Sequence, residues 1–579
     1  MIAIDPAIQK KATLWLNSPI DEDSKAEIRR MMESENPDEI VDAFYKDLEF
    51  GTGGLRGIMG VGSNRVNKYT IGMATQGFAN YLLKAFPDQD ISVAIAYDSR
   101  NNSQYFGEIT ASVFSANGIK VYLFSELRPT PELSYSIRKL GCKGGVVLTA
   151  SHNPKEYNGY KAYWDDGGQV VAPHDKNIVA EVQAISGVEA VKFEADESRI
   201  ERITTLIDEP YLEAITTNVV TPEAIANQHD LKIVFSPIHG TGITMVPRIL
   251  DKIGFTEVHV VEEQAMPDGN FPTVIYPNPE ESEAMSMALN LARDLDADLV
   301  MGTDPDSDRV GIGVKNHHGE WQLLNGNQAA TCMIYYLLKA WEAKGKLNGN
   351  QYICQTVVTT DLLAKMAASF GVDAEYTLTG FKWIAAKLKE NEGKREFIGG
   401  GEESYGYLVN DFVRDKDAII SCAMLAELVA YAKDQGMSLF DMLMDIYVQF
   451  GMFRESLISI KKTGKKGAEE IQQMMADLRG NPPAELQGSP VVEVLDYKSL
   501  IAKNLQSGEE RTLDFPSSNV LQYITADGTK VSARPSGTEP KIKFYFSVQA
   551  PLADKSAFDE VYAGLGQKID GIIADMKLN

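Results

Sequence analysis

Short apolar runs that stop abruptly at polar loops recur along the first 360 residues of the chain. They occupy residues 91–100, 144–154, 231–242, 297–309 and 352–361. Such runs, rich in β-branched residues, are typical of strands that are covered on both faces. Between some of them, apolar residues recur at three-to-four spacing, which predicts amphipathic helices over 282–297 and 327–345.

This alternation of strand, loop and helix predicts an α/β architecture, in which ligands gather at the carboxyl ends of strands. The pattern recurs about three times before residue 455, which suggests duplicated α/β units, although no strict sequence period is present. Beyond a lysine-rich connector at 461–470, the composition changes to a smaller α+β tail. We expect that tail to end in a strand over 541–549 and a helix over 557–576.

Charge and composition exclude several classes of function. The 579 residues include 81 acidic and 56 basic side chains, a net charge of −25, which argues against nucleic acid or an anionic membrane as the main partner. Asp and Lys interrupt the apolar N-terminal stretch and no run reaches about 18 apolar residues, so neither a signal peptide nor a membrane span is expected and the protein is predicted to be cytoplasmic. The four cysteines lack CxxC spacing, which favours buried free thiols.

The loop GTDPDSDRVG places Asp304, Asp306 and Asp308 at alternating positions, so three carboxylates can face one point. Hard oxygen ligands at this density suit Mg²⁺ or Ca²⁺. An EF-hand is excluded because Arg309 stands where that loop requires glycine and Lys315 where it requires glutamate. The alternative is a solvated acidic turn. Arg309, beside the carboxylates, is a candidate clamp for an anionic substrate.

The stretch VVLTASHNPKEYNGYK carries a serine at the end of a predicted strand. Ser151 stands beside Asn153 and Pro154, which would present its hydroxyl outward, and Lys161 follows ten residues later as a candidate proton donor or acceptor. Serine is a weak nucleophile that needs such help. An ordinary helix N-cap explains the same Ser-His-Asn sequence, and no GxSxG elbow supports a hydrolase triad. For His152, adjacent to the serine, a structural hydrogen bond is the favoured role.

Two further loops offer binding groups. In GGGEESYGY (399–407), Glu402 and Ser404 suit adjacent sugar hydroxyls, although a polar turn explains them equally well. In ARPSGTEPKIKFY (533–545), a guanidinium, two hydroxyls and free backbone N–H groups match the oxygens of a phosphate. The glycine-rich segment FGTGGLRG (50–57) follows a helical pattern rather than a strand, so it is no dinucleotide-binding fingerprint. Arg56 in this segment is another candidate phosphate contact.

The serine loop, the three-aspartate loop, the GEES loop and the RPSGT loop occur in this order and at these separations in the α-D-phosphohexomutase superfamily, which the sequence resembles over essentially its whole length. The overall length, TGFKWI (379–384) and VRDKDA (413–418) look most like the long phosphoglucomutase branch, which includes phosphopentomutases. The resemblance implies three related α/β domains with mixed sheets and a smaller α+β C-terminal domain around a central cleft. The expected boundaries are 1–205, 206–325, 326–455 and 456–579.

The same resemblance implies a role for each site residue. Ser151 is the phosphoserine, Lys161 matches the proposed general base, and Arg56 and Arg309 flank the transferred phosphoryl group. The implied Mg²⁺ ligands are Ser151, Asp304, Asp306 and Asp308. The implied substrate contacts are His152, Thr379, Gly380, Lys382, Glu402, Ser404, Arg414, Lys416, Arg534, Ser536, Gly537 and Thr538. Among these, Glu402 and Ser404 match the pair that grips the 3- and 4-hydroxyls of the sugar.

One position departs from a bacterial phosphomannomutase branch that resembles this chain. That branch has a histidine two residues after the sugar-loop serine, where this chain has Gly406. No acid or base role of that histidine carries over. Lys161 is therefore the principal candidate for proton transfer, and Lys416 is the second.

The resemblance implies interconversion of α-D-glucose 1-phosphate and glucose 6-phosphate, with Mg²⁺ and glucose 1,6-bisphosphate as cofactors. Glucose and mannose differ at C2, and contacts to the 3- and 4-hydroxyls do not distinguish them. Phosphomannomutase activity therefore stays open, as does phosphopentomutase activity. A sugar-bisphosphate synthase and a non-catalytic sugar-phosphate sensor are alternatives of another class. The expected partners are small-molecule sugar phosphates, and the protein is expected to be a monomer or a homodimer.

Overall fold

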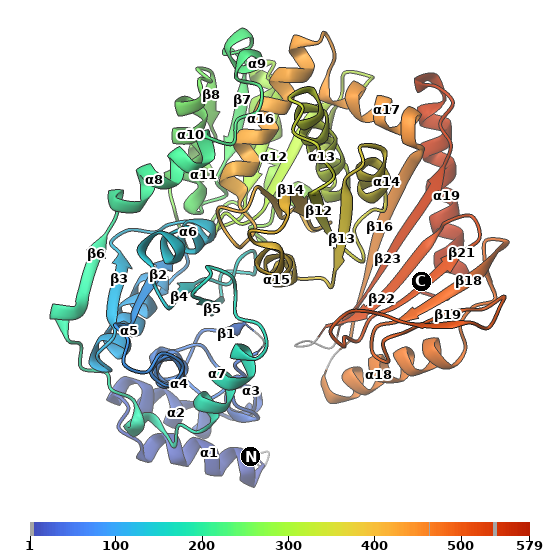
Figure 1. Cartoon of the computed structure of the whole chain (residues 1–579). Helices are drawn as coiled ribbons and strands as arrows, with labels where there is room; N and C mark the ends of the chain where they lie inside the picture. The colour runs from blue at the N-terminus through green and yellow to red at the C-terminus, as the bar shows by residue number, and fades with distance from the viewer. Residues whose placement is uncertain (1–4, 52, 463, 537–540, 579) are drawn as a thin grey trace. The chain divides into compact units, whose positions relative to one another are not determined.

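The computed structural model describes residues 5–51, 53–462, 464–536 and 541–578 of the chain. Figure 1 traces this chain from the N-terminus in blue to the C-terminus in red. It falls into two compact units. The first unit comprises residues 1–326, 381–399 and 404–436, and the second comprises residues 327–380, 400–403 and 437–579.

A six-stranded mixed sheet in the order β1-β5-β4-β2-β3-β6 organises the start of the first unit. Neighbouring strands are parallel from β4 through β2 and β3 to β6. On the other side of β4, β5 is antiparallel to both of its neighbours, β4 and β1. The carboxyl ends of β2 and β4 therefore lie at the same edge. The strands are β1 (Gly54–Ile58), β2 (Ser92–Tyr97), β3 (Lys120–Phe124), β4 (Gly144–Leu148), β5 (Tyr157–Trp164) and β6 (Ile200–Ile203).

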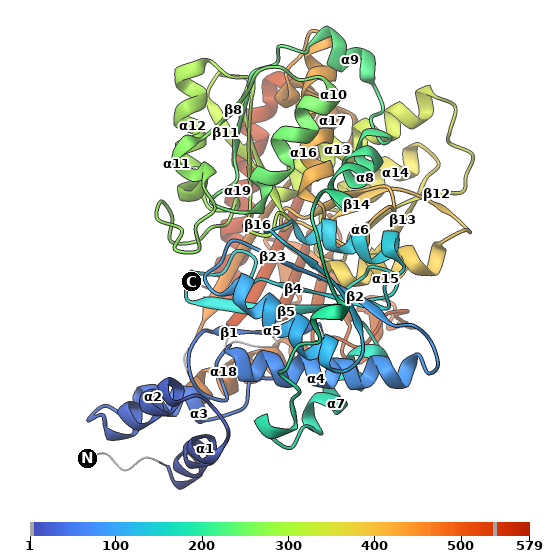
Figure 2. The same ribbon diagram turned by 90° about the vertical axis from the view of Figure 1, so that its left-hand side faces the viewer.

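Alternate residues of these strands enter two different cores. In β2, Val93 and Ile95 pack with α4 and α5, whereas Ala94 and Ala96 pack with α6 and α8. A strand buried on both faces needs no polar alternation, which is why its sequence is a continuous apolar run. Figures 1 and 2 both show α5 and α6 on opposite faces of the sheet. The helices are α4 (Lys68–Ala85), α5 (Ser103–Ala116), α6 (Thr130–Leu140), α7 (His174–Gln183) and α8 (Thr205–Thr216).

Three short helices precede this sheet and lie beside α4 (Figure 2). They are α1 (Pro6–Asn17), α2 (Glu22–Glu33) and α3 (Asp38–Phe44). A cavity of about 1110 Å³ separates α1 from α4 and α7, and Trp15, Met73 and Val182 are among its lining residues. Of the predicted site residues that the structure describes, none lines this cavity.

A second mixed sheet, also in the first unit, has the order β11-β10-β9-β7-β8. β7 is parallel to β8 and β9, and β10 returns antiparallel to β9 after the aspartate loop. The strands are β7 (Ile233–Ser236), β8 (Val258–Val260), β9 (Leu299–Thr303), β10 (Val310–Lys315) and β11 (Trp321–Leu324). The helices are α9 (Pro222–Asn227), α10 (Val246–Ile253), α11 (Glu262–Ala265) and α12 (Ser282–Leu295).

The third α/β segment of the chain is divided between the units. The second unit contains α13 (Gly326–Ala343) from its second residue onward, β12 (Gln351–Thr356), α14 (Leu362–Ser369) and β13 (Asp373–Thr377), with β12 and β13 paired in parallel. The first unit contains α15 (Phe381–Asn391), β15 (Tyr407–Val409) and α16 (Ala418–Asp434). β14 (Glu396–Gly401) begins in the first unit and ends in the second.

The C-terminal part of the second unit is an antiparallel sheet in the order β16-β23-β22-β21-β18-β19-β20, with β17 paired to β18. Its strands are β16 (Met452–Lys461), β17 (Glu485–Leu486), β18 (Ser489–Asp496), β19 (Ile501–Asn504), β20 (Glu510–Thr512), β21 (Leu521–Thr525), β22 (Lys530–Pro535) and β23 (Lys541–Ala550). Its helices are α17 (Leu439–Phe450), α18 (Gly464–Gly480) and α19 (Phe558–Asp575).

The predicted fold class is confirmed: three α/β domains with mixed sheets precede a C-terminal antiparallel sheet domain. The connector predicted at 461–470 is wrong, because α18 begins at Gly464 and β16 already belongs to the C-terminal sheet. A lysine-rich sequence favours a solvated helix face as readily as a linker. Across the described residues, every helix is too short or too polar to cross a membrane. The four predicted domain boundaries stay a prediction.

Candidate active site

The serine loop follows β4 at the carboxyl edge of the first sheet. Residues 151–156 form turns and lead directly into β5, so Ser151 does not cap a helix. Its φ of 52° lies in the left-handed region, which is costly for a serine and is typical of functional turns. The Ser151 N–H donates to Oγ1 of Thr149 at 2.8 Å, and that hydroxyl donates to Asp98 at 2.6 Å.

Arg100, just after β2, anchors the same loop from the other side. Its guanidinium donates to the carbonyl oxygens of Ser151, Asn153, Pro154 and Tyr157. The group is buried, and Nε lies 3.4 Å from the carboxylate of Asp98. Burial lowers the pKa of Arg100 to about 10, so it remains a cation at neutral pH. A buried cation that satisfies four carbonyl groups fixes the strained turn.

The aspartate loop follows β9 at the carboxyl edge of the second sheet. Asp304, Asp306 and Asp308 are fully buried, and one carboxylate oxygen of each lies within 4.8 Å of those of the other two. Oδ1 of Asp304 accepts the N–H groups of Asp308 and Arg309, both at 3.1 Å, which closes the loop on itself. The prediction that the three carboxylates face one point is confirmed.

The two loops meet inside the first unit. Oγ of Ser151 donates to Oδ2 of Asp304 at 2.9 Å, and it lies 3.1 Å from Nδ1 of His152. Burial and the positive charges of Arg309 and Arg56 lower the pKa of His152 well below its usual range, so the imidazole is neutral at pH 7. The contact with Ser151 is a structural hydrogen bond of the kind predicted for His152, and a contact of His152 with substrate stays a prediction.

Two lysines contact the Oδ2 atoms of Asp306 and Asp308. Nζ of Lys161, on β5, lies 2.7 Å from Oδ2 of Asp306 and 3.1 Å from Oδ2 of Asp308. Nζ of Lys416 lies 3.0 Å from the same oxygen of Asp308. Asp415 accepts the N–H of Lys416 at 2.8 Å and the hydroxyl of Tyr163 at 2.6 Å, which fixes the approach of Lys416.

The departure at Gly406 has a steric explanation. A Cβ atom at this position would lie 2.1 Å from Cδ of Lys416. A histidine at 406 and the observed position of Lys416 are therefore incompatible. Lys416 occupies the space that the missing side chain leaves, and it brings a titratable nitrogen to the aspartate loop.

The remaining oxygens fit a divalent cation. Among the described residues, Oδ1 of Asp306 and Oδ1 of Asp308 are buried and have no hydrogen-bond partner, which is costly unless a cation binds them. Burial, followed by the charges of Asp308 and Asp306, raises the pKa of Asp304 well above its usual range. Lys161 and Lys416 outweigh burial and hold the pKa of Asp308 below its usual range. The all-oxygen donor set suits Mg²⁺.

Two arginines flank the cluster. Nη1 of Arg56, an exposed residue on β1, donates to Oδ1 of Asn153 at 3.0 Å, which places the guanidinium beside the serine loop. Nη1 of Arg309 donates to Glu280 at 2.5 Å, and its Nε lies 3.8 Å from Oδ1 of Asp308. The ion pair with Glu280 holds Arg309 at the edge of the aspartate loop.

Two predicted substrate contacts are held elsewhere in the first unit. Arg414 is buried, and its guanidinium donates to the carbonyl of Asp411 and pairs with Glu392 at 3.0 Å. Lys382, on α15, lines a cavity of about 250 Å³ together with Asp166 and His174. Burial lowers the pKa of Lys382. The contact of each with substrate stays a prediction.

The second unit brings together two predicted sugar-binding segments. The N–H of Gly380 donates to Oε1 of buried Glu402 at 2.7 Å. Gly380 has φ 113°, a conformation that favours glycine. Among the described residues, the Thr379 hydroxyl has no hydrogen-bond partner. Burial, followed by the charge of Glu402, raises the pKa of neighbouring Glu403 to about 7.

Ser404 returns the sugar loop to the first unit and is half-buried. The next residue, Tyr405, has φ 67°, and its carbonyl accepts the N–H of Val310 at 3.1 Å. Val310 opens β10, directly after the aspartate loop. Backbone pairing therefore joins Ser404's segment to the end of the aspartate loop.

The described part of the predicted phosphate loop ends the strand pair β22 and β23. Arg534 and Ser536 are half-buried, and the N–H of Ser536 donates to the carbonyl of Lys541 at 2.7 Å. Gly537 and Thr538 lie outside the described residues. The phosphate-binding role of this loop stays a prediction.

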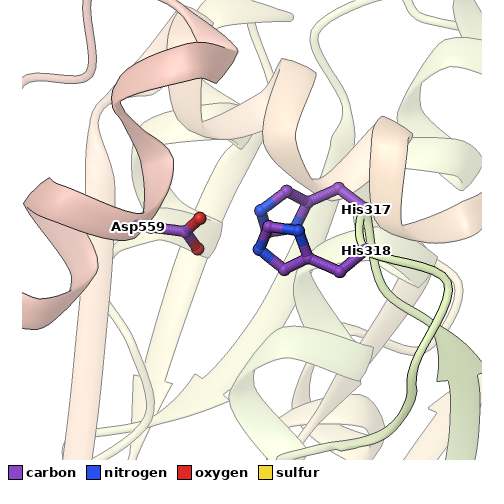
Figure 3. Close-up of side chains that lie close together, drawn as sticks. All are labelled: His317, His318 and Asp559. Atoms are coloured by element: carbon purple, nitrogen blue, oxygen red, sulfur yellow. The ribbon is translucent and has the colours of Figure 1, made fainter.

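Figure 3 draws a second group of metal-ligating residue types. His317 and His318 are exposed neighbours in the turn between β10 and β11, with ring centroids 3.9 Å apart. Asp559, on α19, is exposed and belongs to the second unit. Because the three residues come from different units, we assign no site to them.

Arg100, Asp98, Thr149 and Glu280 are site residues that the sequence analysis did not identify. Asp98 and Arg100 end the stretch at 91–100, directly after its apolar residues, so their position at the carboxyl end of a strand was a usable signal. Glu280 lies before α12 in a polar segment with no comparable signal.

Comparison with known proteins agrees with this geometry. Residues 47–189, 209–319 and 325–450 match, in order, alpha/beta/alpha domains I, II and III of phosphoglucomutase/phosphomannomutase. A phosphoglucomutase of Staphylococcus epidermidis is 35% identical over 543 residues, which cover 93% of this chain and 97% of that protein. One of Staphylococcus aureus is 33% identical over 549 residues, with coverage of 94% and 96%.

Solved structures show the same fold. The open form of Paramecium parafusin, described as a phosphoglucomutase, matches with a TM-score of 0.66 at 17% identity and covers 92% of this chain and 95% of its own. A phosphoglucomutase/phosphomannomutase family protein of Burkholderia thailandensis matches with a TM-score of 0.64 at 17% identity, with coverage of 91% and 97%.

Proposed function

Since this chain belongs to the phosphoglucomutase/phosphomannomutase family and is a phosphohexomutase, an intramolecular phosphotransferase, we propose that it interconverts α-D-glucose 1-phosphate and glucose 6-phosphate. The observation that carries the proposal is the hydrogen bond from Ser151 Oγ to Asp304, one of three clustered buried carboxylates. A hydroxyl held in this way can store a phosphoryl group. The curated relatives named phosphoglucomutase support glucose as the sugar.

Two transfers complete the proposed reaction. In the first, a free sugar hydroxyl attacks the phosphorus of phosphorylated Ser151, the P–O bond to the serine breaks, and the hydroxyl proton passes to the enzyme. The bisphosphate then turns over in the site. In the second, Ser151 takes the other phosphoryl group, and the enzyme returns the proton to the sugar oxygen that leaves.

Residues of this chain would perform the proton and charge steps. Lys161 and Lys416 both reach Asp308, so we assign proton transfer to Lys161 with Lys416 as the second candidate. Arg56 and Arg309 would stabilise the oxygens of the phosphoryl group in transit. Asp304, Asp306 and Asp308 would hold Mg²⁺, which supplies Lewis acidity that draws charge from the departing serine oxygen.

The predicted sugar and phosphate loops would hold the rest of the substrate. We propose that Glu402 and Ser404 bind the 3- and 4-hydroxyls and that the Arg534 loop binds the phosphate that does not react. The site must bind the bisphosphate in both orientations. This requirement favours contacts to hydroxyls and no recognition of the configuration at C2. Monomeric or dimeric assembly and cytoplasmic location stay predictions.

The test is phosphorus NMR of glucose 1-phosphate with the purified protein, Mg²⁺ and a trace of glucose 1,6-bisphosphate. Formation of glucose 6-phosphate supports the proposal. If mannose 1-phosphate or ribose 1-phosphate is converted faster, the substrate assignment is replaced by phosphomannomutase or phosphopentomutase. Net accumulation of bisphosphate without mutase turnover would indicate a synthase, and the absence of any turnover would indicate a sensor.

A further inference from the structure

One carboxylate of the aspartate loop is held by a neutral hydroxyl from another domain. Oγ1 of Thr130 donates to Oδ2 of Asp306 at 2.9 Å, the same oxygen that Nζ of Lys161 contacts at 2.7 Å. Thr130 and Asp306 are both fully buried. With Oδ2 doubly occupied, the other oxygen, Oδ1, is buried without a hydrogen-bond partner among the described residues.

The fold positions Thr130 rigidly. It is the first residue of α6, between Pro129 and Pro131, and the helix is fixed to the sheet by buried Leu133 and Ile137. The backbone N–H of Thr130 also donates to the backbone carbonyl of Asp306 at 2.9 Å. Two hydrogen bonds therefore join residues that lie 176 positions apart in the chain.

Two other contacts of the aspartate loop act on its backbone. The N–H of Thr241 donates to the carbonyl of Pro305 at 2.8 Å, and the N–H of Ala418 donates to that of Ser307 at 3.1 Å. These bonds fix the path of the loop but leave carboxylate rotation free. Thr130 instead donates its hydroxyl to a carboxylate. Lys161 contacts both Asp306 and Asp308, whereas the Thr130 hydroxyl contacts Asp306.

We infer that Thr130 is a positioning residue of the proposed cation site: its hydroxyl holds Oδ2 of Asp306, so that Oδ1 is the oxygen presented to a divalent cation. The inference rests on the proposed Mg²⁺ site. It assigns Thr130 a task that Lys161 cannot perform alone, because Lys161 is also assigned to proton transfer. Partners of metal ligands typically change metal affinity by about 10–100-fold when they are removed.

The test is calorimetric titration of Mg²⁺ into the dephosphorylated full-length protein and three variants. Thr130→Val keeps the shape and removes the hydroxyl, Thr130→Ser restores it, and Thr110→Val is the matched control. Thr110 is a buried threonine on α5 of the same sheet domain, whose hydroxyl donates to the carbonyl of Phe106 at 2.8 Å. We expect Thr130→Val to bind Mg²⁺ about 10–100-fold more weakly, and the other two variants to bind like the natural protein.

The outcomes separate this inference from the proposed function. If Thr130→Val binds Mg²⁺ as tightly as the natural protein, the role of Thr130 is rejected and the cation site stands. If the natural protein binds no Mg²⁺, the cation site and the role of Thr130 fall together. Should Thr130→Val fail to fold, Thr130→Ala is compared with Thr110→Ala by the rise in unfolding midpoint that saturating Mg²⁺ produces, and an equal rise rejects the inference.

Discussion

The serine and aspartate loops differ from the sugar-binding segments in how many protein side chains hold them in place. Arg100 and Thr149 hold the backbone of Ser151, and lysines contact the Oδ2 atoms of two of the aspartates. In the two predicted sugar-binding segments of the second unit, Glu402 accepts one backbone N–H from Gly380, while the Thr379 hydroxyl has no hydrogen-bond partner among the described residues. The groups that react are held in position in advance by the protein, and the groups predicted to bind sugar hydroxyls keep hydrogen-bonding capacity for the ligand.

This comparison predicts that damage to the serine loop abolishes chemistry, whereas damage to the sugar loop weakens binding. The largest effect is expected for Ser151→Ala, because no other described group in the cluster replaces the oxygen that accepts the phosphoryl group. We expect mutase activity to fall on the order of 10⁴-fold. Phosphorus NMR measures the loss, and Ser112→Ala on α5, where the hydroxyl bonds within the helix, is the control. Retained activity in Ser151→Ala would show that another residue carries the phosphoryl group.

The next largest effect is expected from removal of the cation. Among the described residues, Asp306 and Asp308 each present a buried oxygen without a hydrogen-bond partner, and a bound metal ion supplies several kcal/mol of charge stabilisation. EDTA should lower kcat by at least about 100-fold, and added Mg²⁺ should restore it. Full activity of chelated protein, with the metal content checked by mass spectrometry, would contradict the assignment.

A smaller effect is expected in the sugar loop. Glu402→Gln keeps the side-chain volume and removes the charge that would accept sugar hydroxyls, a contribution of about 1.5–3 kcal/mol. KM for glucose 1-phosphate should rise by about 10–100-fold, with a smaller change in kcat. Glu485→Gln, at an exposed position in β17, is the control. A fall in kcat at unchanged KM would place Glu402 among the reacting groups and break the comparison.

The smallest effect is expected in the pH dependence of stability. Burial raises the pKa of Asp417, the N-cap of α16, to about 7, despite the bonds that it accepts from Ile419, Ile420 and Tyr211. The folded protein therefore holds this proton more tightly than the unfolded chain. The resulting stability is complete below the unfolded pKa of about 3.9 and is lost as the pH rises through about 7.

Between pH 5.5 and 7.5, Asp417 should account for a loss of about 1–2 kcal/mol in the free energy of unfolding. Thermal unfolding at both pH values measures it, and Asp417→Asn should show a smaller fall in midpoint than the natural protein. Asp434→Asn, at the other end of α16, should behave like the natural protein. An equal fall in all three would assign the pH dependence to other groups.

The sequence by itself predicted the strands that carry the site and most residues at their carboxyl ends. Buried strands of α/β sheets are continuous apolar runs, so the runs at 144–154 and 297–309 identified β4 and β9. A nucleophile and three closely spaced carboxylates are dense local signals, and the four-motif pattern extended them to Lys161 and Lys416. These signals lie within a few residues of one another or follow a known order.

Only the tertiary structure decided which distant groups support them. Arg100 is 51 residues from Ser151, and Thr130 is 176 residues from Asp306. Neither pairing has a period or a spacing in the sequence, because it depends on how helices and sheets pack. The sequence marks Gly406 only as a departure from a related branch, and the fold shows that it leaves the space that Lys416 fills. Local pattern determines elements and reactive residue types, whereas packing determines which side chains hold them in place.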